Sequence, residues 1–105
     1  MIYAGFRVTP GPGQALSLMP LVARVNELVS KHGGKPIANF AVAFGGTGSG
    51  DHIHIFGYQD WAAIGASGEA LQADPDWQKL IAETGPKIAS LASSILQPMP
   101  GSPLQ

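Results

Sequence analysis

Residues 36–44, PIANFAVAF, read as a strand that is apolar on both faces. Alternate residues of a strand point to opposite sides of its sheet. One side carries Ala38, Phe40, Val42 and Phe44, and the other carries Ile37, Asn39, Ala41 and Ala43. Both sides of such a strand need cover, but the helices of a small domain can cover only one face of its sheet. We therefore expect a second subunit to cover the other face.

The content of charged residues supports the same expectation. Only 12% of the 105 residues are charged and 45% are hydrophobic, whereas a typical soluble domain carries about 25% charged residues. A chain of this length fits one domain, residues 1–105, with a large surface relative to its volume. Part of that surface must be apolar, which predicts an interface, by default that of a symmetric homodimer joined through sheet faces.

Several classes of function are disfavoured by composition. The net charge of −1 leaves no basic excess to neutralise phosphates, so we expect no nucleic-acid partner. The chain has no cysteine, which excludes disulfides, thiol nucleophiles and cysteine-ligated metals. No apolar run approaches the ~20 residues of a membrane span, and the start MIYAGFRV does not resemble a signal peptide. We expect a soluble, cytoplasmic protein without membrane association.

Strand and helix signals alternate along the chain. Apolar residues three and four apart mark helices, and β-branched or aromatic runs between glycine and proline mark strands. The predicted strands are residues 2–8, 36–44, 51–58 and 92–97, and the predicted helices are residues 14–32, about 61–73 and a segment from Pro75. The order is β-α-β-β-(α,α)-β with a right-handed first crossover and a central hairpin. This is the ferredoxin-like, split βαβ arrangement of the α+β class, with an antiparallel sheet.

Prolines and capping residues set the helix boundaries. Pro20 conflicts with an unbroken helix from Gln14, so either Ser17 caps the helix or the helix kinks at Pro20. Asp60 is a candidate cap for the second helix, and Asp74 followed by Pro75 is the best helix start in the chain.

The end of the last helix is harder to place. Gly85-Pro86 interrupts it, and we expect Ile88 and Leu91 to continue it in a second piece. The closing segment, Pro98 to Leu104, contains Met99 and Leu104 but no charge. We expect this tail to be ordered against its own subunit or a partner.

His54 is the strongest candidate for a catalytic residue. Its strand is central in a ferredoxin-like sheet, and His52, His54, Phe56 and Tyr58 share one face of it. If same-parity residues pair across the hairpin, His54 lies beside Val42 or Phe40. A histidine in an apolar wall can be a general base, a hydrogen-bond donor to a ligand or a metal ligand. The candidate ligand-binding residues around it are Phe40, Val42, His52, Phe56 and Tyr58.

A purely structural role for His54 remains open. Its ring could be satisfied by a backbone carbonyl or by Tyr58. Burying an unpaired imidazole costs about 1–3 kcal/mol, so a buried His54 needs a hydrogen-bond partner. We therefore expect His54 to be largely buried beside a cavity, where a water molecule or a ligand can be that partner. His52, at the loop end of the strand, is expected to be more exposed.

Three other patterns in the sequence give weaker evidence for a functional site. His52 and His54 have metal-ligand spacing, but two ligands do not make a site, and we predict no metal. The loop GGTGSG, Gly45 to Gly50, lacks the lysine of a P-loop and precedes a strand, so we expect a mobile hairpin loop. Ser49, Asp51 and His52 are near-neighbours in one loop, whereas the residues of a catalytic triad converge from separate elements.

The chain resembles the NIPSNAP family in several segments that occur in order along its length. These are MIY with the turn PGPG, KHGGKPI, HIFGY, ADPDW and SSILQPMPGSPL. The resemblance implies a ferredoxin-like monomer whose sheet packs on a second copy to form a dimeric α/β barrel. Proteins of that architecture include cofactor-independent monooxygenases, polyketide cyclases, muconolactone isomerases and haem-handling enzymes. The NIPSNAP branch itself has no single established reaction.

The chain departs from the family pattern where charges would stand. Ala4 and Phe6 replace an acidic and a basic residue of the first strand, and Ala92 and Ser94 replace a Glu and an Arg of the last. Charged positions on the helix before Asp74 become Ala63, Ile64 and Gly65. These losses favour an apolar cavity or interface over an ionic site.

Two functions follow as hypotheses. The first is an enzyme of the monooxygenase, cyclase or isomerase type that needs no bound cofactor. It would act on a small apolar organic molecule that His54 polarises or deprotonates. The second is a non-catalytic module for small-molecule binding or protein interaction, with packing histidines. A cavity with a few converging polar groups favours the first, and a filled interior favours the second.

Overall fold

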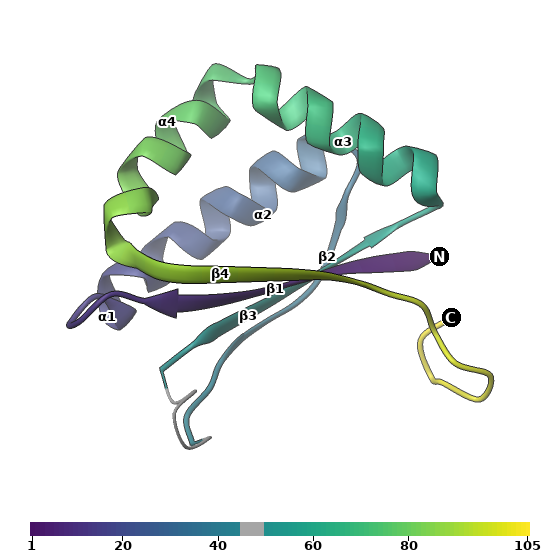
Figure 1. Cartoon of the computed structure of the whole chain (residues 1–105). Helices are drawn as coiled ribbons and strands as arrows, with labels where there is room; N and C mark the ends of the chain where they lie inside the picture. The colour runs from purple at the N-terminus through teal and green to yellow at the C-terminus, as the bar shows by residue number, and fades with distance from the viewer. Residues whose placement is uncertain (45–49) are drawn as a thin grey trace.

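An antiparallel sheet in the strand order β2-β3-β1-β4 forms the base of the computed structural model, which describes residues 1–44 and 50–105 (Figure 1). The elements are β1 Ile2–Pro10, α1 Ala15–Leu18, the 3-10 helix η1 Met19–Leu21, α2 Val22–Lys31, β2 Lys35–Ala41, β3 His52–Tyr58, α3 Trp61–Ala73, α4 Pro75–Thr84, the 3-10 helix η3 Gly85–Lys87 and β4 Ile88–Leu96. The predicted α+β, ferredoxin-like order is confirmed, and β3 is a central strand.

The helices lie on one face of the sheet (Figure 1). The core between the two layers consists of Ala4, Leu28, Val29, Phe56, Tyr58, Leu71 and Leu80. Gly34, between α2 and β2, is closely packed against this core. A Cβ at Gly34 would collide with Val29 and come within 2.9 Å of the Tyr58 hydroxyl oxygen.

Pro20 divides the first predicted helix. α1 ends at Leu18, η1 spans the proline, and α2 begins at Val22. Of the two alternatives, the break at Pro20 is the one observed, because proline lacks the N–H that a continuous helix needs. Ser17 does not cap the helix: its hydroxyl donates to the Gln14 carbonyl oxygen at 2.9 Å.

The two predicted aspartate caps are confirmed. The Asp60 carboxylate accepts a hydrogen bond from the Ala63 backbone N–H at 2.8 Å, and α3 follows. The Asp74 carboxylate accepts from the Asp76 N–H at 2.9 Å, with Pro75 in the first turn of α4. Each carboxylate satisfies a donor that the first turn of a helix leaves unpaired.

The helical continuation through Ile88 and Leu91 was wrong. Both residues belong to β4, which begins at Ile88, four residues before the predicted start at residue 92. Ile88 pairs with Pro10 and Leu91 with Val8. Their three-residue spacing imitates a helix, but Pro86 ends α4, and pairing with β1 then decides the conformation.

The face of the sheet opposite the helices has little cover. Phe40 is 58% exposed there, and Leu96 is 43% exposed. The tail folds into a turn in which the Ser102 N–H donates to the Met99 carbonyl, and the Tyr3 hydroxyl donates to the Gln105 carbonyl at 3.1 Å. The tail thus forms a turn that returns to β1, whereas Met99 and Leu104 are exposed; its order in solution stays a prediction.

The hairpin loop predicted over Gly45 to Gly50 lies outside the described residues except for Gly50. Within residues 1–44 and 50–105, no helix has both the length and the apolar character to cross a bilayer.

Candidate functional site

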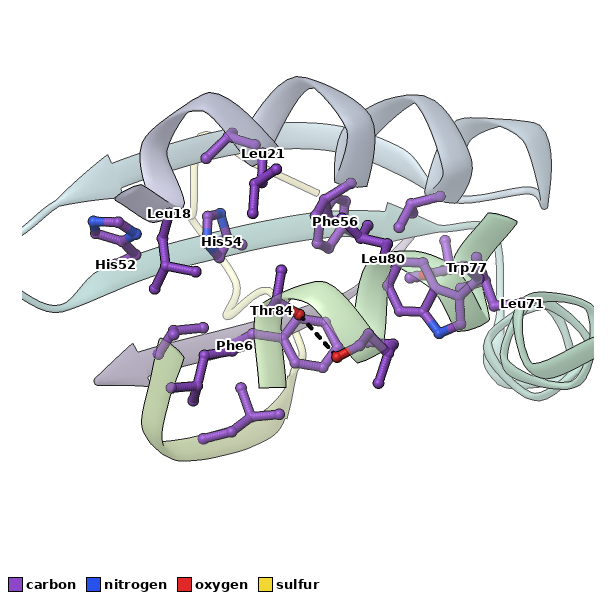
Figure 2. Close-up of a pocket in the computed structure, with 18 residues that line it drawn as sticks. Phe6, Leu18, Leu21, His52, His54, Phe56, Leu71, Trp77, Leu80 and Thr84 are labelled. Carbon is purple, nitrogen blue, oxygen red and sulfur yellow. Dashed lines mark hydrogen bonds between the residues drawn. The ribbon is translucent and has the colours of Figure 1, made fainter. Parts of the chain in front are cut away.

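A cavity of about 200 Å³ lies between the helices and the sheet (Figure 2). Its wall is almost wholly carbon and is formed by Phe6, Val8, Leu18, Leu21, Val22, Val25, Val29, His52, His54, Phe56, Tyr58, Leu71, Trp77, Leu80, Ile81, Thr84, Ile88 and Leu91. Interiors normally hold few voids larger than a water molecule. A dry apolar cavity of about 150 Å³ already accepts benzene. This space therefore has the size of a small organic molecule.

The cavity has a polar and an apolar end. His52 and His54 lie together at one end, whereas Trp77 and Leu71 lie at the other (Figure 2). The two imidazole rings stand edge to face with centroids 6.2 Å apart. Ile81 and Leu91 line the cavity yet are 50% and 60% exposed, so the mouth lies between α4 and β4.

β3 supplies the polar end as predicted. His52, His54, Phe56 and Tyr58 all line the cavity from one face of this strand. They alternate with Ile53, Ile55 and Gly57, which point to the other side of the sheet. Four of the six predicted site residues are therefore brought together.

The predicted positions of Phe40 and Val42 were wrong. The register between β2 and β3 pairs His54 with Asn39, and Phe40 with Ile53. Opposite residues of an antiparallel pair share a face, so Phe40 lies on the face without helices. Val42 is half-buried and does not line the cavity. The prediction assumed that residues of equal parity pair across the hairpin, whereas this register pairs residues of opposite parity.

The burial of the two histidines is the reverse of the prediction. His52 is only 4% exposed, and His54 is half-buried. The break at Pro20 creates α1, whose buried Leu18 reaches the part of the cavity that His52 lines. At the same end of β3, Asp51 is buried and accepts a hydrogen bond from Arg7 at 2.7 Å. The loop end of the strand is therefore covered, whereas the prediction assumed that it would be open to solvent.

His54 is held by a pair of asparagines. Asn39 on β2 places its amide nitrogen 2.7 Å from Nδ1 of His54. Asn26 on α2 donates to the Asn39 amide oxygen at 2.8 Å, and Asn39 donates back to Asn26 at 3.3 Å. Burial and the neighbouring His52 lower the pKa of His54. The imidazole is thus neutral at pH 7. Asn39 was not among the predicted site residues, although a lone amide in an apolar strand was a usable signal.

His52 has a different environment. Its Nε2 is buried and has no hydrogen-bond partner among the residues that the structure describes. An unpartnered buried polar atom costs about 1–3 kcal/mol of stability. His52 contributes the rest of its ring to the wall, while this nitrogen is sealed from the cavity.

No charged side chain lines the described part of the cavity wall. Phe6 contributes to this wall at one of the positions where the sequence departs from the family's charged pattern, and its ring packs edge to face on Phe56 with centroids 6.0 Å apart. The described residues contain no group of three His, Asp or Glu side chains suited to a metal ion. The polar groups available here are imidazole and the Thr84 hydroxyl in an otherwise apolar space.

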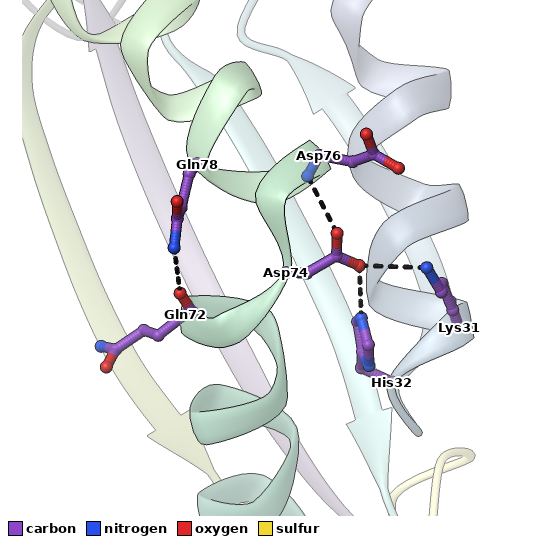
Figure 3. A network of polar contacts seen from close by, with 6 residues as sticks. All are labelled: Lys31, His32, Gln72, Asp74, Asp76 and Gln78. Atoms are coloured by element: carbon purple, nitrogen blue, oxygen red, sulfur yellow. Dashed lines mark hydrogen bonds and ion pairs between the residues drawn. The ribbon is translucent and has the colours of Figure 1, made fainter.

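A second polar cluster lies outside this cavity, where α2 meets the start of α4 (Figure 3). Asp74 is buried and accepts hydrogen bonds from His32 at 2.7 Å and Lys31 at 3.2 Å. The His32 bond, the Asp76 N–H and Lys31 lower the pKa of Asp74 to about 2. Asp74 thus joins the end of α2 to the start of α4, which is a structural role.

Comparison with known proteins settles the family. The NIPSNAP family model matches residues 6–103. The chain belongs to the NIPSNAP family. No curated protein sequence matches this NIPSNAP chain.

Solved structures of NIPSNAP proteins have the same fold. One from Agrobacterium tumefaciens superposes with a TM-score of 0.88 at 24% identity, over 99% of this chain and 98% of that one. An uncharacterized NIPSNAP domain protein from Burkholderia xenovorans gives a TM-score of 0.87 at 17% identity, over 98% and 99% of the two chains. An antibiotic biosynthesis monooxygenase gives a TM-score of 0.67 at 14% identity, over 95% and 100%. At these identities the likeness establishes the fold alone.

Proposed function

We propose that this NIPSNAP protein binds a small, neutral, mostly apolar organic molecule in the cavity between its helices and its sheet, and transforms it without a bound cofactor. The observation that carries this proposal is an apolar cavity of about 200 Å³ with His54 at one end. A space of this size is expensive to keep empty, since an unfilled cavity costs stability in proportion to its volume. A filled interior would have favoured the non-catalytic module.

The absence of charge in the described wall limits the ligand. An ion placed there would lose its hydration without finding a counter-ion, which is strongly unfavourable. The volume is below the roughly 300 Å³ of drug-sized pockets. We therefore infer a neutral molecule of about one or two rings, held by contact with carbon and oriented by one or two hydrogen bonds.

The proposed reaction is of the monooxygenation, cyclisation or isomerisation type. The likeness in fold to an antibiotic biosynthesis monooxygenase supports this class. His54 supports it chemically, because a neutral imidazole in an apolar space can polarise a substrate or move a proton. Binding without turnover of any such substrate would instead identify a non-catalytic binding module.

We further propose that the protein is a homodimer joined through the open faces of the sheets. Phe40 and Leu96 are exposed on this face, and Ile53 and Ile55 are only partly covered. An interface of the obligate kind buries roughly 2,000 Å² or more. Association would remove the apolar side chains of the open face from water, which stabilises the dimer.

The binding proposal is tested by closing the cavity. In Val25→Phe, a phenyl group enters the space from α2, and we expect the loss of naphthalene binding measured by NMR titration. The matched control is Ala23→Phe, which adds the same group to the exposed side of the same helix. Unchanged binding of naphthalene to Val25→Phe, or none to the wild type, would overturn the proposal. If naphthalene binds as expected, mass spectrometry of the purified protein would search for the natural ligand.

A further inference from the structure

Asn39 determines which nitrogen of His54 carries the proton. The side-chain nitrogen of Asn39 is an amide NH₂ group, which donates hydrogen bonds and cannot accept them. It lies 2.7 Å from Nδ1 of His54. Nδ1 must therefore be the acceptor in this bond and carry no hydrogen. In a neutral imidazole, the single proton is then on Nε2.

Asn26 couples the orientation of the Asn39 amide to its own. Asn26 donates to the Asn39 oxygen at 2.8 Å and accepts from the Asn39 nitrogen at 3.3 Å. Rotating the Asn39 amide by half a turn would place two oxygens and two nitrogens face to face in this pair. Asn26 would have to turn as well. The pair of asparagines thus joins α2, β2 and β3, and only a turn of both amides together would place the Asn39 oxygen at Nδ1.

The surroundings keep the His54 ring neutral. Its pKa is lowered by burial and by the neighbouring His52. A protonated ring would also carry a hydrogen on Nδ1, directed at the NH₂ group of Asn39. Both effects disfavour the imidazolium form at pH 7.

We propose, building on the function proposed above, that the cavity recognises a neutral carbonyl compound, with His54 donating a hydrogen bond through Nε2 and Asn39 acting as the positioning residue that fixes this role. Nε2 lies on the side of the ring away from Asn39, and no hydrogen bond joins it to another of the described residues. A donor at the edge of an apolar cavity binds an acceptor atom on the ligand.

A carbonyl fits this donor better than a hydroxyl. A carbonyl oxygen accepts hydrogen bonds and brings no donor of its own. A hydroxyl brings a proton that needs an acceptor, and the Thr84 hydroxyl oxygen, beyond the histidines on a wall made almost wholly of carbon, is the one that α4 offers. The unpartnered Nε2 of His52 cannot serve, because it is buried away from the cavity. An unpaired donor in such a space is unfavourable.

The assignment changes the chemistry expected of His54. With Nδ1 occupied by Asn39 and Nε2 protonated, the ring has no free lone pair with which to remove a proton. It can instead polarise a carbonyl and stabilise negative charge that develops on its oxygen. Of the two roles considered for His54, polarisation is thus the one that the hydrogen bonds support.

The tautomer is read directly by NMR. Long-range ¹H–¹⁵N spectra of the free wild-type protein distinguish a protonated from an unprotonated nitrogen in each imidazole. We expect His54 to have the proton on Nε2. In Asn39→Asp, measured at pH 8.5, the carboxylate can only accept, so the proton is expected to move to Nδ1. Gln59→Glu adds the same charge at an exposed position and should leave the tautomer unchanged.

Binding of two isosteric probes tests the recognition. Acetophenone has a carbonyl oxygen where α-methylstyrene has a methylene group. We expect the wild type to bind acetophenone about tenfold more tightly, as one hydrogen bond to an otherwise unpaired donor provides. This preference should disappear in Asn39→Asp and persist in Gln59→Glu.

Each outcome decides between the proposals. A proton on Nδ1 of His54 in the wild type overturns the role of Asn39. Equal binding of the two probes overturns carbonyl recognition and leaves the binding function intact. Failure of both probes to bind contradicts the binding function and carbonyl recognition together.

Discussion

Replacing His52 and His54 separately by leucine should change stability in opposite directions. In His52→Leu, the unpartnered buried Nε2 is removed and the side-chain volume is nearly kept. An unsatisfied buried group costs about 1–3 kcal/mol, so the free energy of unfolding should rise by about 1–2 kcal/mol. For a domain of this size, each kcal/mol raises the melting temperature by about 4–8 °C.

His54→Leu removes a satisfied group instead. The Asn39 amide loses its acceptor at Nδ1 and keeps only its bonds to Asn26. We expect the free energy of unfolding to fall by about 1–2 kcal/mol. Two histidines on one face of one strand would thus differ by about 2–4 kcal/mol in the effect of the same substitution.

The measurement is guanidinium unfolding followed by circular dichroism at pH 8. The concentration of protein must be the same for all variants, because the stability of a dimer depends on it. A loss of 1 kcal/mol or more in His52→Leu would show that Nε2 has a partner in solution, and the reasoning would then be wrong.

Three further predictions concern other parts of the molecule. The low pKa of Asp74, about 2 against its usual 3.8, stabilises the fold above pH 3.8 and stops doing so as the pH falls toward 2. Asp74→Asn should therefore lower the melting temperature at pH 7 and flatten its pH dependence between pH 4 and 2; an unchanged pH profile would contradict the role of His32 and Lys31. Ile55→Glu places a charge on the open face and should convert the proposed dimer into a monomer by light scattering at micromolar concentration, whereas a monomeric wild type would refute the dimer itself. Leu80→Ala should cost about 2–5 kcal/mol in denaturant unfolding, because this core side chain is almost fully buried and also lines the cavity; a cost below 1 kcal/mol would mean that the helices collapse onto the space.

The sequence predicts the fold well because the helices begin and end at residues with strong local preferences, namely capping aspartates and prolines. Asp60 and Asp74 cap the helices that follow them, and Pro20 interrupts the helix in which it lies. These effects act over a few residues and are visible in a single sequence. The start of β4 was misplaced because the three-residue spacing of Ile88 and Leu91 matches a helix, whereas pairing with β1, through a register shift between Thr9 and Pro10, places both in the strand.

The candidate site was predicted less completely for a related reason. The shared face of His52, His54, Phe56 and Tyr58 follows from strand geometry within one segment. The neighbour of His54 on β2 depends on the register between two strands, which the residues of either strand alone do not determine. A shift of one position exchanged Phe40 for Asn39, and with it an apolar contact for a hydrogen bond.

The helices α2 and α4, which line the cavity opposite the sheet, are joined by ion pairs near both ends of the cavity. Near one end, Arg24 of α2 forms an exposed ion pair with Glu83 of α4 at 2.8 Å, and at the other end the buried Asp74 carboxylate holds Lys31 and His32. The exposed pair contributes little in salt solution, but the buried one holds the two helices together.

We therefore expect a ligand to enter by rotation of side chains at the mouth, such as Ile81 and Leu91, without separation of the helices. Rotamer changes of exposed side chains occur in picoseconds to nanoseconds, whereas collective movements of helices take microseconds or longer. Exchange of a weakly bound ligand should accordingly be fast on the NMR chemical-shift timescale. It should not show the dependence on solvent viscosity that a movement of whole helices would produce. The residence time of the ligand would then be set by its contacts inside the cavity.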